Sequence, residues 1–185
     1  AFFAGAVAVA EASPQHLNLL AQAHILLGTA EGQMGNIQGE AEAYAQAISA
    51  YDSLVRMLPD APAFQLEQTQ VQLDLAQALL EQGYAGQAAT QLKSVTQSLS
   101  DLRSRFSDSL PIVEAYGVAQ DLWGVALGMK GQYDEGLDHL EAAIDTLDGL
   151  GTRGVKPAAA VAWRNRRRVN AAFREGSWEA GTVMR

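Results

Sequence analysis

The amino-acid sequence predicts an all-α fold, an α-solenoid of stacked antiparallel helix pairs, from three observations. Gly35, Gly83 and Gly131 follow one another at the same interval of 48 residues (35 to 83 and 83 to 131), and self-similarity at a period of roughly 20–50 residues is typical of helical repeat proteins. Alanine, leucine and glutamine dominate and β-branched runs are scarce, which favours helices. The third observation is that every proline lies between helical patterns, at Pro14, Pro59, Pro62, Pro111 and Pro157.

The interval divides the chain into about three and a half repeats preceded by a short apolar segment. Within each repeat the glycine separates two helical patterns. The resulting segments are 1–12 (apolar N-terminal segment), 13–60 (repeat 1), 61–108 (repeat 2), 109–156 (repeat 3) and 157–185 (a partial, basic repeat 4).

The first helices of the three full repeats are expected at 15–33, 64–81 and 112–129. Ser13-Pro14 reads as an N-cap serine followed by proline at the first helical position. Each helix then carries a bulky residue followed by a small one that lets a neighbouring helix approach closely: Leu27-Gly28, Leu75-Ala76 and Trp123-Gly124.

The second helices are expected at 38–58, 85–106 and 133–149. Apolar residues recur there at steps of three and four, which places them on one helical face. The columns in register are Tyr44/Leu92/Leu140, Ala47/Val95/Ala143, Tyr51/Leu99/Leu147 and Leu54/Leu102/Leu150. In the partial repeat, helices are expected at 158–174 and from about 177 onward.

Charge is distributed unevenly along the chain. The net charge is −8, but residues 1–152 hold 19 acids and 5 bases, whereas residues 153–185 hold 2 acids and 8 bases. Such a division indicates an oriented partner or head-to-tail association, the alternative being a solvated surface with one basic end. The absence of cysteine excludes disulfides and thiolate metal sites and leaves the compartment open.

The first ten residues carry no charge, and they have two interpretations. They are either the end of a membrane or signal segment, for which Ala10-Glu11-Ala12 has the form of a cleavage site, or the second helix of an earlier repeat. In the repeat register Phe3 falls on Tyr51 and Ala6 falls on Leu54, which supports the second interpretation. A cytoplasmic, membrane-associated or periplasmic location is open on this evidence.

At this level of detail the chain resembles the tetratricopeptide repeat family over nearly its whole length. The third repeat carries the closest match, with Trp123-Gly124, Leu127, the turn 131–136, Leu140 and Ala143. The family repeat is about 34 residues, so this one is longer, and about two extra turns in each helix would keep the packing faces nearly in phase. The segments 40–44 and 54–60 resemble long-period arrays in large bacterial regulatory proteins such as multidomain serine/threonine kinases, although no kinase motif is present.

The resemblance implies a concave groove lined by the first helices, which would take a peptide or a partner helix. The alternative is that the longer helices shift the groove and that some of these residues are simply packed. The groove residues implied are Gln22, Ile25 and Thr29 in repeat 1, Gln70, Leu73 and Gln77 in repeat 2, Val118, Asp121 and Val125 in repeat 3, and Trp163, Arg166, Asn170 and Arg174 in repeat 4.

An arginine-rich run in the partial repeat forms the densest charge in the chain. It is either a solvated face or a patch for a protein partner with an acidic segment, whereas nucleic acid is disfavoured because the rest of the chain is acidic and would repel phosphates. The patch comprises Arg153, Arg164, Arg166, Arg167 and Arg168.

The sequence offers no catalytic constellation. His16, His24 and His139 fall on three different helices, and the G-x-G-x-x-G at 149–154 follows a helix rather than the strand that a dinucleotide fingerprint requires. It is expected to be a flexible loop between repeats, after a helix that ends near Gly149. We therefore expect a non-catalytic interaction scaffold without metal or cofactor, the alternative being a structural subunit of a membrane-associated complex anchored through the apolar N-terminus.

Overall fold

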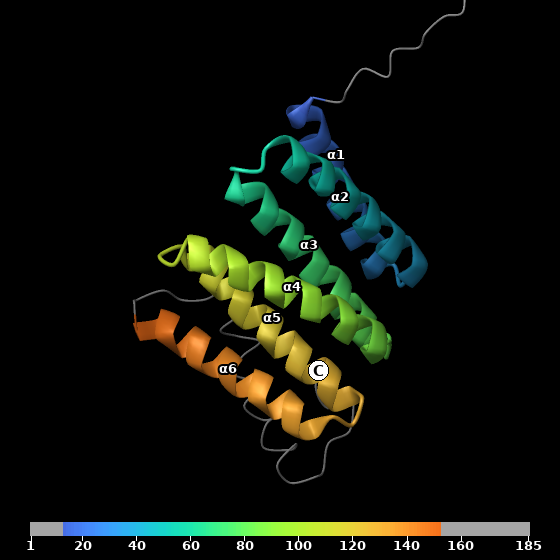
Figure 1. The fold of residues 1–185 in the computed structure, drawn as a ribbon. Coiled ribbons are helices and arrows are strands. Elements are labelled where there is room, and N and C mark those ends of the chain that lie inside the picture. The colour runs from blue at the N-terminus through green and yellow to red at the C-terminus, as the bar shows by residue number, and fades with distance from the viewer. Residues whose placement is uncertain (1–12, 153–185) are drawn as a thin grey trace, which may run out of the picture. The chain divides into compact units, whose positions relative to one another are not determined.

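The computed structural model describes residues 13–152, and this part of the chain is all-α, as predicted, with six helices and no strand (Figure 1). The segments 1–12 and 153–185, including the helices expected at 158–174 and beyond 177, lie outside the described residues. The described residues divide into two compact units, 13–64 and 65–152. The helices are α1 (Pro14–Gln33), α2 (Ile37–Met57), α3 (Pro62–Glu81), α4 (Ala85–Arg105), α5 (Leu110–Met129) and α6 (Tyr133–Thr152).

The helix boundaries reproduce the repeat. First helices begin at Pro14, Pro62 and Leu110 and second helices begin at Ile37, Ala85 and Tyr133, each 48 residues after its predecessor. Ser13 caps α1 as predicted, because its hydroxyl accepts a hydrogen bond from the His16 N–H at 3.3 Å. One expectation was wrong. The helix expected to stop near Gly149 continues to Thr152, because Leu147 and Leu150 lie on its buried face and keep its last turn packed.

The first unit contains the antiparallel pair α1 and α2, which pack along their length (Figure 1). Nearly all of its core comes from α2, with buried residues that include Tyr44, Tyr51 and Leu54. In α1 only Ala21 and Gly28 are buried. The first helix of this unit is therefore covered on one side alone.

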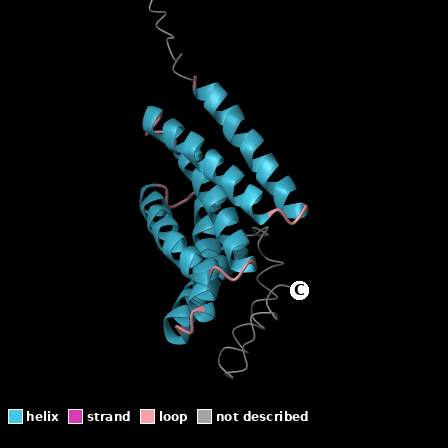
Figure 2. Cartoon of the chain, turned by 90° about the vertical axis from the view of Figure 1, so that its right-hand side faces the viewer, coloured by secondary structure: helices cyan, strands magenta, loops and turns pink. Residues whose placement is uncertain are grey.

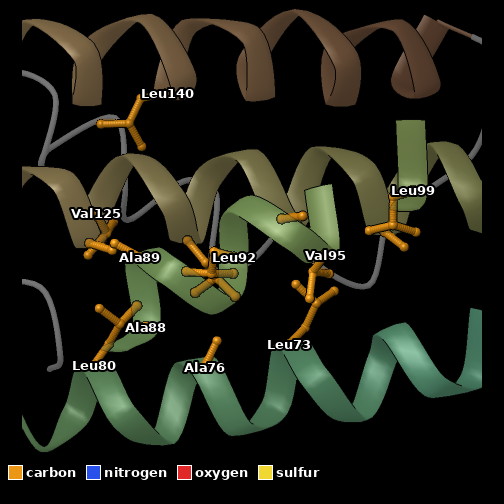
Figure 3. Packing of buried hydrophobic residues seen from close by; sticks show 14 of the residues in the cluster. Leu73, Ala76, Leu80, Ala88, Ala89, Leu92, Val95, Leu99, Val125 and Leu140 are labelled. Atoms are coloured by element: carbon orange, nitrogen blue, oxygen red, sulfur yellow. The ribbon is translucent and has the colours of Figure 1, made fainter. Parts of the chain in front are cut away.

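The second unit contains α3 from Gln65 onward, α4, α5 and α6. Buried side chains of α3, α4 and α5 form one hydrophobic cluster that extends to α6 at Leu140, and Leu92 and Leu99 of α4 are fully buried in it (Figure 3). The four predicted columns of the second helices are confirmed, since all their members are buried in both units. Burying a leucine of this kind contributes about 1.5–3 kcal/mol.

The three spaced glycines end the first helices in the same way, in the short loops visible in Figure 2. Their φ angles are 75° for Gly35 and 81° for Gly83 and Gly131, a left-handed conformation that side chains with a Cβ rarely adopt. The glycine N–H donates to the carbonyl three residues earlier, and the next N–H donates to the carbonyl five residues earlier, which satisfies the last carbonyls of the helix. The longer bonds are Asn36–Glu31 (2.9 Å), Tyr84–Leu79 (2.8 Å) and Gln132–Leu127 (2.9 Å).

The predicted close approach at the small residues is confirmed in both units. A Cβ placed on Gly28 would lie 2.8 Å from the Tyr44 ring. One placed on Gly124 would lie 2.6 Å from the Leu140 side chain and 2.7 Å from the carbonyl oxygen of Gly136. Since Tyr44 and Leu140 occupy the same position of the repeat, glycine sets the helix spacing in the same way in α1–α2 and α5–α6.

Candidate interaction surface

Five of the predicted groove residues carry exposed or partly exposed polar or apolar side chains on α1 and α3. Gln22 and Thr29 are exposed on α1, with Ile25 half-buried between them. The Thr29 hydroxyl donates to the Ile25 carbonyl at 3.0 Å. On α3, Gln70 and Gln77 are exposed and donate to the carboxylates one turn later, Asp74 at 3.1 Å and Glu81 at 3.0 Å.

Two predicted groove residues are instead part of the core. Leu73 and Val125 are each 2% exposed and belong to the cluster of the second unit, where Leu73 points from α3 toward α4 (Figure 3). Their side chains are not available to a partner in this conformation, because both pack in the core of the second unit. On α5, Val118 and Asp121 are half-buried.

Trp163, Arg166, Asn170 and Arg174, and the basic patch of Arg153, Arg164, Arg166, Arg167 and Arg168, all lie outside the described residues.

A cluster of aromatic and polar side chains that the sequence reasoning missed joins α4, α5 and α6. We call it the aromatic cluster, and it consists of Arg103, Tyr116, Gln120, Trp123 and His139. Gln120 links two of its members, because its side-chain nitrogen donates to the Tyr116 hydroxyl at 2.7 Å and its oxygen lies 2.5 Å from Nδ1 of His139. The His139 ring stacks on Trp123 with centroids 3.8 Å apart. From α4, the Arg103 guanidinium lies 4.3 Å from the centre of the Tyr116 ring.

The hydrogen bond to Gln120 fixes the form of His139. Because the Gln120 nitrogen donates to Tyr116, its oxygen accepts a hydrogen bond from the Nδ1–H of His139, so in the neutral ring Nε2 carries no proton. Burial lowers the pKa of His139 below its ordinary value of 6.5. The nearby carboxylates of Glu135 and Asp138 act in the opposite direction and offset only part of this lowering. One period earlier the second helix contacts the first at the same two positions in a different way, because the Gln91 side chain donates to the backbone carbonyl of Gln72 at 2.8 Å.

The solvent side of α6 is a continuous acidic stripe. Its carboxylates recur at steps of four, three, four and three residues and are all exposed, and α6 carries no lysine or arginine. The corresponding positions of α4 hold Lys93 and otherwise uncharged residues, and those of α2 hold two acids, Glu42 and Asp52, so among the described repeats the full stripe occurs in the third. It consists of Asp134, Asp138, Glu141, Asp145 and Asp148.

Another carboxyl group, that of Asp74 on α3, is perturbed by its surroundings. Burial raises its pKa above the ordinary value of 3.8, and the hydrogen bond from Gln70 offsets part of this effect. No second carboxylate or histidine is hydrogen-bonded to it among the contacts of the described residues.

Several kinds of site are absent between residues 13 and 152. No group of three or more histidine, aspartate or glutamate side chains is arranged to hold a metal ion. No helix of this part of the chain is long and apolar enough to cross a membrane. Comparison with protein-family models, with curated proteins and with solved structures gives no match to this chain.

Proposed function

We propose that this chain is a non-catalytic scaffold whose helix pairs stack into a solenoid of the tetratricopeptide type and bind a protein segment along the first helices. The observation that carries the proposal is the placement of exposed amides on successive first helices. Gln22 on α1 and Gln70 on α3 are one repeat apart and both exposed, and Gln77 lies two turns further along α3. The regular turns and helix boundaries support a repeated helix-pair unit of constant length.

Amide side chains at such positions suit a peptide backbone. Each carries two donors and an acceptor, so it can pair with the N–H and C=O groups of an extended segment without regard to its side chains. Gln70 and Gln77 are already oriented by hydrogen bonds to Asp74 and Glu81, which reduces the conformational entropy lost on binding. The partner is a protein or peptide segment. An acidic portion of that segment would suit the arginine-rich residues of the partial repeat.

The experiment compares two triple variants in partner capture. In the test variant Gln22, Gln70 and Gln77 become alanine, and in the control variant the exposed glutamines of the second helices, Gln46, Gln87 and Gln97, become alanine. Partners that co-purify with the native chain from its source cells are identified by mass spectrometry, and the affinity of the most enriched one is measured for each variant.

The test variant is expected to bind about tenfold to a thousandfold more weakly, since each of the three amides contributes roughly 0.5–1.5 kcal/mol, while the control variant binds as the native chain does. Circular dichroism checks that both variants keep their helices. Equal affinity of the two variants for every partner would show that the first helices do not form the binding surface. A catalytic activity of the purified chain, lost on changing one residue, would contradict the non-catalytic role.

A further inference from the structure

The outer face of α1 is apolar and uncovered among the described residues. Leu19 is 64% exposed, Leu20 46%, Leu26 72% and Leu27 49%. With the exposed Ala23 and Ala30 they follow helical spacing and share one face. Large apolar residues gathered on one face of a helix are rarely left in water without a partner.

The third repeat shows what covers this face when it is complete. The positions of Leu19, Ala23, Leu26 and Ala30 recur 96 residues later, and the corresponding residues of α5 are all buried: Ala115, Ala119, Leu122 and Ala126. α4, the second helix that precedes α5 in the chain, packs along α5 and contributes to the same cluster. The partner of this face is thus the preceding second helix.

We propose that residues 1–9 pack on the N-terminal half of the α1 face as the last turns of α4 pack on α5. Residues 1–9 fall in register with 97–105, the last nine residues of α4, and the four residues 10–13 match the connection 106–109 in length. Phe3 takes the position of Leu99, which is fully buried.

The repeat register also predicts a specific pair of contacting residues. Arg103 lies over Tyr116 in the second unit, and the residues 96 positions earlier are Val7 and Leu20. A cation–π contact is thereby replaced by an apolar pair. The sizes of a second pair are reversed. Leu102 of α4 and Ala115 of α5, both in the core cluster, correspond to Ala6 and Leu19, so the large residue lies on the other partner. The apolar character of 1–10 fits a segment that covers leucines better than one that faces water.

The experiment joins the proposed contact chemically in the full chain, which contains no cysteine of its own. A Val7→Cys/Leu20→Cys variant is treated with a short bis-maleimide, which spans the distance between packed helices. The matched control is Val7→Cys/Gln22→Cys, because Gln22 is almost as near in sequence but lies on another face of α1. Intramolecular crosslinking is measured by mass spectrometry with and without denaturant.

The Val7–Leu20 pair is expected to crosslink several-fold faster than the Val7–Gln22 pair, and the difference is expected to vanish in denaturant. Equal rates for the two pairs in the folded chain would overturn the proposal. Crosslinked dimers of the Val7–Leu20 variant in place of intramolecular product would also overturn it and would assign the face to a second copy. A chain that lacks residues 1–9 provides an independent readout: hydrogen exchange in residues 14–23 is expected to be several-fold faster than in the full chain, and unchanged exchange would count against the contact.

Discussion

At the scale of single residues, glycine has two physically different roles in this chain. Gly124 lies in an ordinary helical conformation and is required for space, because the helix α6 leaves no room for a Cβ. Gly149 lies on the same helix pair, in α6, but nothing lies within 4 Å of the position where its Cβ would be. The same substitution should therefore have opposite effects at the two positions.

We expect Gly124→Ala to destabilise the chain by about 1–3 kcal/mol, because the new Cβ meets the Gly136 carbonyl and Leu140 at less than 3.0 Å. Gly149→Ala should stabilise it by about 0.5–1 kcal/mol through helix propensity. Urea denaturation monitored by circular dichroism measures both. A neutral or stabilising Gly124→Ala would mean that α5 and α6 do not approach as closely as described.

The aromatic cluster makes stability depend on pH. Since the pKa of His139 is lowered by burial, the unfolded chain takes up a proton below about pH 6.5 that the folded chain does not. The contribution of this residue is present above pH 6.5 and is lost as the pH falls through the lowered pKa, by at most about 1.4 kcal/mol per pH unit.

His139→Gln, which places at this position the residue found one repeat earlier at Gln91, is expected to lose less stability between pH 7.5 and pH 5.5 than the native chain. Chemical denaturation at both pH values measures the difference. Identical losses for the two proteins would show that His139 does not contribute to the pH dependence.

The pH dependence of stability that Asp74 contributes should have the opposite sign to that of His139. Because burial raises its pKa, its contribution to stability is present below pH 3.8 and is lost as the pH rises through the raised pKa. Asp74→Asn keeps an oxygen for the Gln70 hydrogen bond and removes the charge, so we expect a more stable chain at pH 7. Thermal melting at pH 7 checks this, and a lower melting temperature for the variant would contradict it.

At the scale of the helix and its turn, the sequence carried most of the information. The positions of Gly35, Gly83 and Gly131 predicted where each first helix ends, because a left-handed residue after a helix is most easily glycine. The spacing of Tyr44, Leu92 and Leu140 predicted the buried face of each second helix. The end of α6 was not predictable, since a glycine at position 149 is compatible with either a helix stop or a tolerated interior residue.

The turns provide a test at this scale. Gly83→Ala is expected to cost about 1–2 kcal/mol, because a φ of 81° brings the new Cβ close to the backbone although no neighbouring residue lies near it. Gly83→Asn should cost less, as asparagine tolerates this conformation better. Denaturation of both variants measures the two values, and equal costs would argue against a conformational origin.

The candidate site was harder to predict from sequence for a physical reason. Burial of a first-helix residue depends on how close the neighbouring helices lie, and periodicity does not determine that distance. Gln70 and Leu73 are three residues apart on one side of α3, yet the first is exposed and the second is in the core. The aromatic cluster depends on side-chain contacts between three helices, which the periodicity of a single helix does not indicate.

At the scale of the whole molecule, the two units differ in how thoroughly their first helices are covered. In α1 only Ala21 and Gly28 are buried. In α5 most of the residues between Ile112 and Gly128 are buried. We therefore expect the C-terminal half of α1, near Leu26 and Leu27, to exchange its amide hydrogens faster than the middle of α5. Hydrogen exchange followed by mass spectrometry tests this in the intact chain. Equal protection of the two helices would indicate a cover on α1 that extends along its whole length.

The glycine turns also bear on how quickly the chain can fold. All their hydrogen bonds join residues no more than five positions apart, and the helices with extensive contacts, α1 with α2, α4 with α5 and α5 with α6, are neighbours in the sequence. Chains whose contacts are this local close only short loops before the contacts form, and they fold among the fastest of small proteins. We therefore expect the native contacts of this chain to form in the order of synthesis, each helix meeting its neighbour in sequence before it meets more distant ones.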